Sequence, residues 1–207
     1  YKLENENLKE GGCNVFPLWF GIVDKPERIN RLLTILSEKE TNVESMSYYP
    51  VIFYKYGRQD MGYHFLKELY ANERRDYPEV ASGVIEGIVR GLAGVDADVT
   101  ANRIATLPRF TDATRWVSIE NIPVFSGKIS ILHQSAGSST LVNKSGKELI
   151  WRAMFPGDVA MINGIDAEHT NDELGNPFSY LDIVCKPGET NTAEVHKYKL
   201  EEDEKFD

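Results

Sequence analysis

Apolar residues recur at helical spacing through the first half of the chain. In residues 24–40 they stand three or four positions apart, at Ile29, Leu32, Leu33 and Leu36. Asp24 and Pro26 precede them, and both residue types are favoured at the start of a helix. The same spacing predicts further helices over residues 16–23, 47–57, 58–73 and 78–94. Since their connections are short, we expect neighbouring helices to form antiparallel hairpins.

Near Asp98 the spacing changes from helical to alternating. Segments that alternate apolar and polar residues then follow between clusters of turn-forming residues, at 103–110, 116–124, 127–135, 139–146, 147–155 and 179–188. Their spacing predicts an antiparallel β-sandwich. Residues 164–179 are polar and predict a long loop, and the charged tail at 199–207 predicts a frayed end. The expected fold is therefore α+β, with a helical domain over residues 1–98 and a β-sandwich domain over residues 99–207.

The last predicted helix carries glycines at roughly helical spacing, at Gly83, Gly87, Gly91 and Gly94. Each costs a helix up to about 1 kcal/mol relative to alanine. That cost is reasonable where another helix or a substrate lies close to the backbone. The predicted helices also make a poor closed bundle by themselves, so we expect further neighbours from upstream hairpins or from another subunit.

The composition argues against two classes of binding partner. The 207 residues are 42% hydrophobic, as in a globular protein, and carry a net charge of −9. An acidic chain without a lysine or arginine run is a poor match for nucleic acid or for an anionic membrane. No apolar segment approaches the roughly 20 residues that span a bilayer. No secretory signal is recognisable and Tyr1 is not a natural start, so we expect a mature, trimmed or fragmentary chain.

Cysteine and histidine are too sparse to indicate a metal site or a disulfide framework. Cys13 and Cys185 lie far apart, without CxxC or Cys/His ligand spacing, and are best interpreted as two buried thiols. The histidines are equally scattered. The sequence therefore predicts no metal and no cofactor. It leaves the compartment open, with the periplasm or the exterior favoured over the cytoplasm.

Several segments together resemble a known family. Three of them resemble the closing helical hairpins of six-hairpin glycosidases: GGCNVFPLWFGIVDKPE, TNVESMSYYPVIFYKYGRQDMGYHFLKELY and RRDYPEVASGVIEGIVRGLAGVDAD. Two more look like the β-domain that follows in bacterial members: NRIATLPRF and WVSIENIPVFSGKISILHQ. The resemblance covers most of residues 11–155. It implies a carbohydrate-active enzyme on an (α/α)6 toroid, of which this chain holds only the last hairpins, while upstream hairpins supply the general acid.

The resemblance also implies that the catalytic base comes from these later hairpins. Inverting glycoside hydrolysis needs two carboxyl groups about 6.5–9.5 Å apart, one protonated and one ionised. Glu79 lies in the first turn of the last long helix, where the helix dipole stabilises a carboxylate, although the same dipole makes glutamate common there without any function. Glu44 leads into an aromatic helix, and it could equally be a solvent-facing residue at a helix start. We weight the two nearly equally as the base.

Aromatic and charged residues near these glutamates are candidate sugar ligands. They are Trp19, Tyr48, Tyr49, Tyr77, Asp76 and Arg75. Aromatic rings can stack on pyranose faces, but a tryptophan in an apolar run is more often a core residue. An aspartate and an arginine can hold hydroxyl groups through charge-assisted hydrogen bonds, or they can form an ordinary surface ion pair.

Two functions stay open at this point. The first is the C-terminal portion of a glycoside hydrolase that acts through a carboxylate acid and base, with a carbohydrate as its substrate. The second is a non-catalytic carbohydrate-binding or structural module, whose aromatic surfaces are interfaces to missing hairpins. The β-sandwich of such enzymes generally carries no catalytic residue, so no candidate is placed there.

Overall fold

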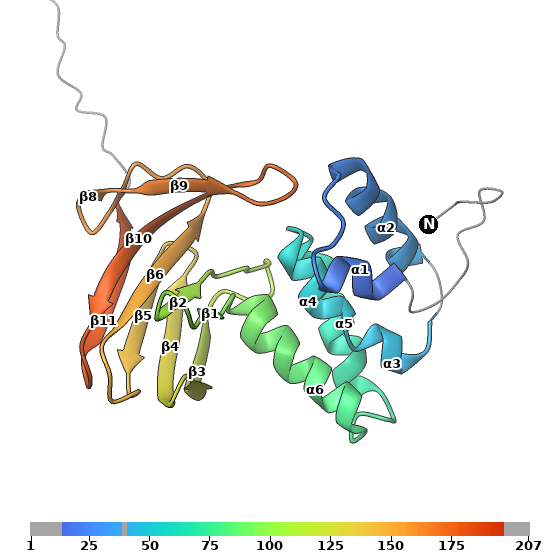
Figure 1. The fold of residues 1–207 in the computed structure, drawn as a ribbon. Helices are drawn as coiled ribbons and strands as arrows, with labels where there is room; N and C mark the ends of the chain where they lie inside the picture. Colours follow the sequence, from blue (N-terminus) through green and yellow to red (C-terminus); the bar gives the residue numbers. More distant parts are fainter. Residues whose placement is uncertain (1–13, 39–40, 197–207) are drawn as a thin grey trace, which may run out of the picture.

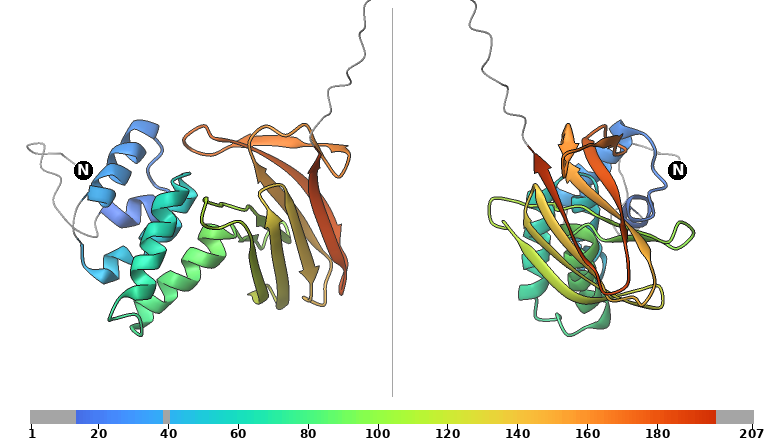
Figure 2. Two further views of the ribbon diagram at one scale, coloured as in Figure 1. Left: turned by 180° about the vertical axis from the view of Figure 1, so that it is seen from behind. Right: turned by 90° about the vertical axis from the view of Figure 1, so that its left-hand side faces the viewer.

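Helices and strands occupy separate parts of the chain. The computed structural model describes residues 14–38 and 41–196, and its helices gather on one side with its strands on the other (Figures 1 and 2). The helices are α1 (Val15–Trp19), α2 (Pro26–Glu38), α3 (Val43–Met46), α4 (Tyr49–Lys55), α5 (Gln59–Ala71), α6 (Pro78–Glu86) and the π-helix η2 (Gly87–Leu92). The predicted α+β class is confirmed.

Helix α4 lies at the centre of the helical part. Every residue from Tyr49 to Tyr54 is buried, and the helix contacts α1, α3, α5, α6 and η2. It ends before Gly57, whose φ of +71° is readily adopted only without a side chain. The chain then enters α5 almost at once, so α4 and α5 form the hairpin that the sequence predicts. The apolar face of α2, which includes Ile29 and Leu33, forms one buried cluster with residues of α4 such as Ile52.

The last predicted helix changes type halfway along its length. It begins at Pro78 as expected, but from Gly87 its backbone is π-helical, and the N–H of Ala93 donates to the carbonyl of Ile88 at 2.9 Å. The glycines of this helix face inner neighbours. A Cβ at Gly91 would meet the Tyr54 ring at 2.6 Å. The expectation that another helix lies close to the glycine backbone is confirmed, and that helix is α4.

The strands form two sheets packed face to face. The first sheet has the order β1-β2-β6-β10-β9 and the second β3-β4-β5-β11-β7-β8. Their bounds are β1 (Asp96–Asp98), β2 (Arg103–Thr106), β3 (Val117–Val124), β4 (Gly127–Ser135), β5 (Ser138–Asn143), β6 (Leu149–Pro156), β7 (Met161–Ile162), β8 (Ile165–Asp166), β9 (Glu168–Asn171), β10 (Pro177–Cys185) and β11 (Thr190–His196). Strand β2 pairs with β6 in parallel, whereas the other pairs of neighbouring strands in the described residues are antiparallel.

Alternating side chains from both sheets fill the space between them. Trp151 of β6 is fully buried, and its indole N–H donates to the hydroxyl of Thr106 at 2.9 Å. Ile131 of β4, in the second sheet, belongs to the same buried cluster. This cluster reaches the helical part through Tyr54 and Leu92. Other buried helical residues form separate clusters, the larger of them around α1, α2 and α4.

Two expectations about the second half need correction. Residues 164–179 are not one long loop, because β8 and β9 lie within them and β10 begins there; β9 pairs with β10 although all its residues are exposed. Strand β11 was also not predicted, since its sequence TNTAEVH carries few apolar residues. The tail at 199–207 and Cys13 lie outside the described residues, while Cys185 is a buried free thiol.

The boundary between the two parts lies in a short connection. The last helical residue is Leu92 and the first strand begins at Asp96. That residues 1–98 and 99–207 are separate domains stays a prediction. Within residues 14–38 and 41–196, no helix has both the length and the apolar character needed to cross a bilayer.

Candidate functional site

Glu44 lies at the start of the short helix α3, at the end of the helical part away from the sandwich (Figure 1). The Asn42 side chain caps this helix by accepting a hydrogen bond from the backbone N–H of Ser45 at 2.8 Å. The Glu44 carboxylate forms a 2.5 Å ion pair with Arg74. The Arg74 guanidinium in turn stands 4.2 Å from the centre of the Tyr77 ring. The loop between α5 and α6 is thereby folded back onto α3.

Glu79 lies close by, in the first turn of α6. Tyr77 is the N-cap of this helix and Pro78 its first residue, so the helix begins where the sequence predicts. Glu79, Arg75 and Asp76 are all exposed. The structure therefore brings both candidate bases to one end of the helical part. Their catalytic role stays a prediction.

The aromatic candidates divide into two environments. Trp19 contacts the edge of Tyr48, with ring centres 5.5 Å apart, and both rings are partly exposed. Tyr49 is instead a core residue at 3% exposure, packed against Phe53 and Phe65. Burial raises the pKa of its phenol. In the described chain, Tyr49 offers no accessible ring to a sugar.

A cleft of about 780 Å³ separates the helical part from the sandwich. One wall is the outer face of the first sheet, and the other comes from α1, α4 and η2. Its polar and aromatic lining residues are Trp19, Lys55, Arg90, Asp96, Asp98, Arg103, Arg109, Arg152, Thr170, Asn171, Asp172, Glu173 and Phe178. Of the residues that the sequence predicts as sugar ligands or bases, only Trp19 lines it.

The turn between β9 and β10 closes one edge of this cleft. Figure 1 shows it reaching from the sandwich towards the helices. Leu174 at its tip packs into the helical core, and Glu173 lies 3.7 Å from the Lys55 ammonium. The Asp172 side chain holds the turn in shape by accepting from the backbone N–H groups of Leu174 and Asn176, both at 2.9 Å. The cleft therefore has a defined rim.

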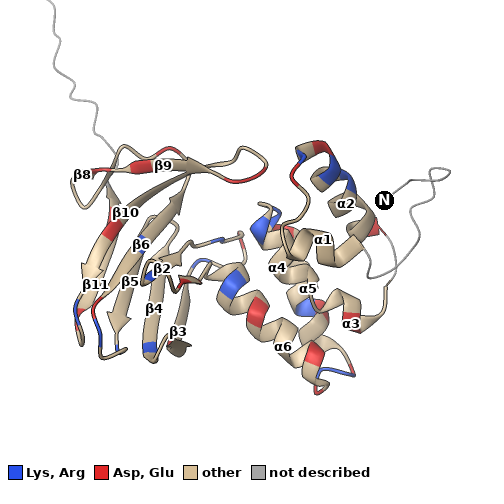
Figure 3. Ribbon diagram, viewed as in Figure 1, with Lys and Arg blue, Asp and Glu red and all other residues tan. Residues whose placement is uncertain are grey.

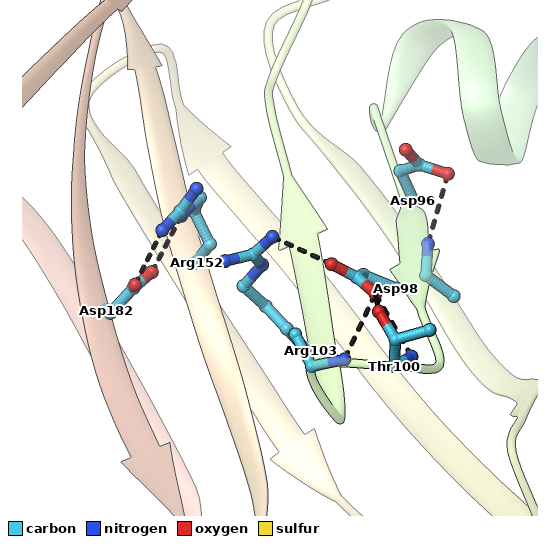
Figure 4. A network of polar contacts seen from close by, with 8 residues as sticks. Asp96, Asp98, Thr100, Arg103, Arg152 and Asp182 are labelled. Atoms are coloured by element: carbon cyan, nitrogen blue, oxygen red, sulfur yellow. Dashed lines mark hydrogen bonds and ion pairs between the residues drawn. The ribbon is translucent and has the colours of Figure 1, made fainter.

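Arginines and carboxylates alternate across the sheet wall. Arg152 of β6 forms a bidentate pair with Asp182 of β10, at 2.8 and 2.7 Å, and Arg103 of β2 bonds to Asp98 of β1 at 2.9 Å (Figure 4). Hydrogen bonds from Thr100 lead the causes that hold the pKa of the Asp98 carboxyl below its usual value. The Asp182 partner raises the pKa of Arg152. These are fixed, charged pairs.

Charges of both signs also lie on α6 and η2. Figure 3 shows acidic positions on α6 and a basic one on η2, and Glu86 forms a 2.6 Å pair with Arg90, which lies one turn along and itself lines the cleft. Within the described ranges, no group of three or more His, Cys, Asp or Glu residues could hold a metal ion.

The carbonyls at the end of η2 are all satisfied from the sandwich side. The Arg109 guanidinium donates to the carbonyls of Arg90 and Gly91 at 3.0 and 2.9 Å, and its backbone N–H donates to Leu92 at 2.9 Å. Burial lowers the pKa of Arg109 to about 10, so it stays charged at neutral pH. The carbonyl of Ala93 accepts from the ring of His133 at 3.0 Å. The cleft thus lies beside a rigid junction.

Sequence reasoning missed the sheet wall of the cleft. A signal was present, because Arg103 and Arg152 each alternate with buried neighbours and must face outwards. Their convergence depends on β2 lying beside β6 in parallel, however, and that pairing joins segments about 50 residues apart in the chain. No local pattern specifies it.

Comparison with known proteins gives a likeness of fold. No family model matches the chain, and no curated protein does. Among solved structures, the chain is similar to a protein from the human microbiome that carries the proposed name kojibiose phosphorylase, with a TM-score of 0.55 at 12% identity. The likeness covers 86% of this chain and 23% of that one. It therefore includes both the helical part and the sandwich, and the chain spans less than a quarter of the similar protein.

Proposed function

We propose that this chain is a segment of a larger carbohydrate-active enzyme of the six-hairpin glycosidase superfamily, and that the enzyme cleaves a glycosidic bond. The observation that carries this proposal is the fold likeness, since it extends through the helices and the sandwich in one alignment. The helical hairpin and the two-sheet sandwich also follow the order that the sequence resemblance implies. On this proposal, the helices are the last part of an (α/α)6 toroid.

The acceptor for the cleaved sugar is either water or phosphate. A disaccharide phosphorylase, the activity in the name of the similar protein, breaks a glycosidic bond with phosphate where a hydrolase uses water. The two reactions differ in whether a carboxylate base is needed, because water must lose a proton and a phosphate dianion is already a nucleophile. Substitution of the candidate bases therefore also tests which of the two reactions the enzyme catalyses.

Glu44 and Glu79 are the proposed bases. Glu79 lies in the first turn of α6, where the helix dipole favours the ionised carboxylate, while Glu44 lies in α3, which is a single turn and has no comparable dipole. Glu44 is further fixed by its ion pair with Arg74, while Glu79 is exposed and free to face a substrate. The general acid is proposed to come from hairpins outside this chain.

A second function is supported by the apolar surface of α1 and of the residues just after it. Phe16, Phe20 and Ile22 are 43%, 63% and 73% exposed, which is unusual for three large apolar residues so close together. This face favours an interface to further helices or to another subunit. On this alternative, the chain is a carbohydrate-binding or bracing module, and the catalytic carboxylates are elsewhere.

The test is an activity screen of the longer enzyme with Glu44→Gln and Glu79→Gln variants. Aryl-glycosides and disaccharides are supplied with water alone and with added phosphate, and release of sugar or sugar phosphate is measured. Removal of the true base lowers hydrolysis by about 10²–10⁴-fold, because a general base contributes that much to the rate. The other glutamate variant retains activity.

Glu120→Gln, an exposed change on β3, is the matched control and keeps full activity. Full hydrolytic activity in both test variants would show that neither glutamate is the catalytic base. Phosphate-dependent cleavage that is insensitive to both changes supports the phosphorylase form. Absence of any glycosidic activity supports the module.

A further inference from the structure

The first turn of α6 has no capping side chain. Its N-cap residue is Tyr77, whose side chain forms no hydrogen bond with the helix. Serine, threonine, asparagine and aspartate are favoured at this position, because their side-chain oxygens accept from the free N–H groups of the first turn. Pro78 presets the backbone angle of the first helical residue but attaches it to no neighbour. The direction of α6 at this end therefore depends on other contacts.

The buried contact at this end of α6 is small. Val80 of α6, Val43 of α3 and Leu69 of α5 form a cluster of three buried residues, with Met46 and Val84 packed at its edge. Apolar burial stabilises a contact in proportion to the area removed from water, so a cluster of this size holds the helix start only modestly. Polar contacts around it therefore contribute a larger share of the attachment.

Arg74 connects α3 with the N-cap of α6. Its guanidinium forms the ion pair with Glu44 and stands 4.2 Å from the centre of the Tyr77 ring. Its backbone carbonyl accepts from the N–H of Tyr77 at 2.9 Å. Its own N–H donates to the side chain of Asn72, also at 2.9 Å, which fixes the loop before it. Both the side chain and the backbone of Arg74 thus hold the residue at which α6 begins.

Arg74 pairs with a carboxylate that is distant in the chain. Three others lie much closer to it in sequence, those of Glu73, Asp76 and Glu79, and within residues 14–38 and 41–196 Arg74 forms no ion pair with any of them. The side chains of Arg74 and Glu44 are 46% and 34% exposed, so water screens their attraction only in part. The two candidate bases therefore differ, because Glu44 is engaged by a cation whereas the exposed Glu79 is not.

We propose that Glu44, Arg74 and Tyr77 form a clamp that fixes the start of α6 to α3 and thereby holds Glu79 in place. Glu44 is then one end of the clamp and not the base. Arg74 is a positioning residue, since it acts on Glu79 through the helix start. The role of Glu79 rests on the proposed function, whereas the clamp rests only on contacts within this chain.

The clamp is tested in this chain by amide hydrogen exchange measured with NMR. The Ala81 amide reports on the helix start, because it donates to the carbonyl of Tyr77 at 2.9 Å. Glu44→Gln, Arg74→Met and Tyr77→Leu each remove one part of the clamp, and we expect each to speed this exchange about three- to fivefold. The double variant Glu44→Gln/Arg74→Met exchanges no faster than Arg74→Met, because both changes remove the same ion pair.

Glu68→Gln and Arg31→Met are the matched controls, at exposed positions of α5 and α2, and they leave the exchange rate unchanged. Circular dichroism verifies that each variant is folded. Two results would overturn the clamp. One is an Ala81 exchange rate that none of the three clamp variants alters. The other is a double variant in which the effects of the two single changes multiply, as they do for independent sites.

In the longer enzyme, the clamp predicts a loss in kcat without a change in KM. Glu44→Gln and Arg74→Met both lower kcat about two- to fivefold, because the base is less well placed while the contacts to the sugar stay the same. Arg74→Lys keeps the charge opposite Glu44 and restores most of kcat. A loss of about 10²-fold or more in Glu44→Gln, with Arg74→Met fully active, would make Glu44 the base and overturn the proposal. Absence of glycosidic activity overturns only the proposed function, since the exchange measurement decides the clamp by itself.

Discussion

His133 is fully buried where the sandwich meets the end of η2. Its Nε2 lies 3.0 Å from the carbonyl of Ala93 and its Nδ1 lies 2.6 Å from the Ser139 hydroxyl. A carbonyl can only accept, so Nε2 carries the proton and Nδ1 accepts from Ser139. The neutral ring is thus fully satisfied. Burial, together with the nearby charge of Arg109, lowers the pKa of His133 to about 4.

This lowered pKa predicts a loss of stability in mild acid. The unfolded chain takes up the histidine proton below about pH 6.5 while the folded chain does not, so the free energy of unfolding falls as the pH drops from there to about 4. At about 1.4 kcal/mol for each pKa unit, the full loss is about 3 kcal/mol. Urea unfolding at several pH values across this window measures it.

Two variants identify the group responsible. His133→Gln is expected to be less stable at neutral pH and to show a flatter dependence between these pH values. His64→Gln, at an exposed position of α5, keeps the slope of the parent chain. Asp98 also has a lowered pKa, but a carboxyl of that kind loses its stabilising effect only as the pH falls below the usual aspartate range, which lies under this window. An unchanged slope in His133→Gln would contradict the assignment.

At the scale of elements, the packing of α6 on α3 and α4 depends on the absence of a side chain at Gly83. A Cβ there would collide with the backbone carbonyl of Ser47, which is itself buried. Backbone cannot rotate away as a side-chain tip can, so one of the two helices must shift. The glycine costs helix propensity, and close approach of the helices offsets that cost.

Gly83→Ala is therefore expected to destabilise the chain by about 1–3 kcal/mol, although alanine is the better helix former. Thermal unfolding followed by circular dichroism measures the change. Ser82→Ala, one residue away on the exposed side, serves as control and is neutral or slightly stabilising. A stabilised Gly83→Ala chain would show that the two helices do not pack as closely as described.

Helices and strands with regular spacing of apolar residues were predictable from the sequence. Strands that form only by pairing with a neighbouring strand were not. Helices α2 and α5 and strand β4 follow their apolar spacing closely. Strand β1 has the sequence DAD and β9 the sequence EHTN, which carry no alternation and form strands only because β2 and β10 offer free edges. The candidate bases were found from helix starts, whereas the cleft needed strand order. The sequence therefore indicates the candidate bases but not the cleft.

For the whole molecule, the important feature is that the core of the sandwich extends into the helical part. Tyr54 and Leu92 belong to the same apolar cluster as Trp151 and Ile131. Residues 107–109 cap the end of η2, and the turn between β9 and β10 returns to the helical part through Leu174. Since the contacts lie at both ends of the cleft, we infer that the two parts form one cooperative unit.

This arrangement predicts a single unfolding transition that depends on Arg109. In urea, helix content measured by circular dichroism and sheet protection measured by hydrogen exchange are expected to be lost together. Arg109→Met removes the donor for two carbonyls at the end of η2 and lowers stability by about 2 kcal/mol, because a hydrogen bond from a charged group contributes about that much. Arg115→Met is the exposed control and has little effect. Loss of helix signal well before sheet protection in the parent chain would show that the sandwich folds by itself and that the helices depend on partners beyond this chain.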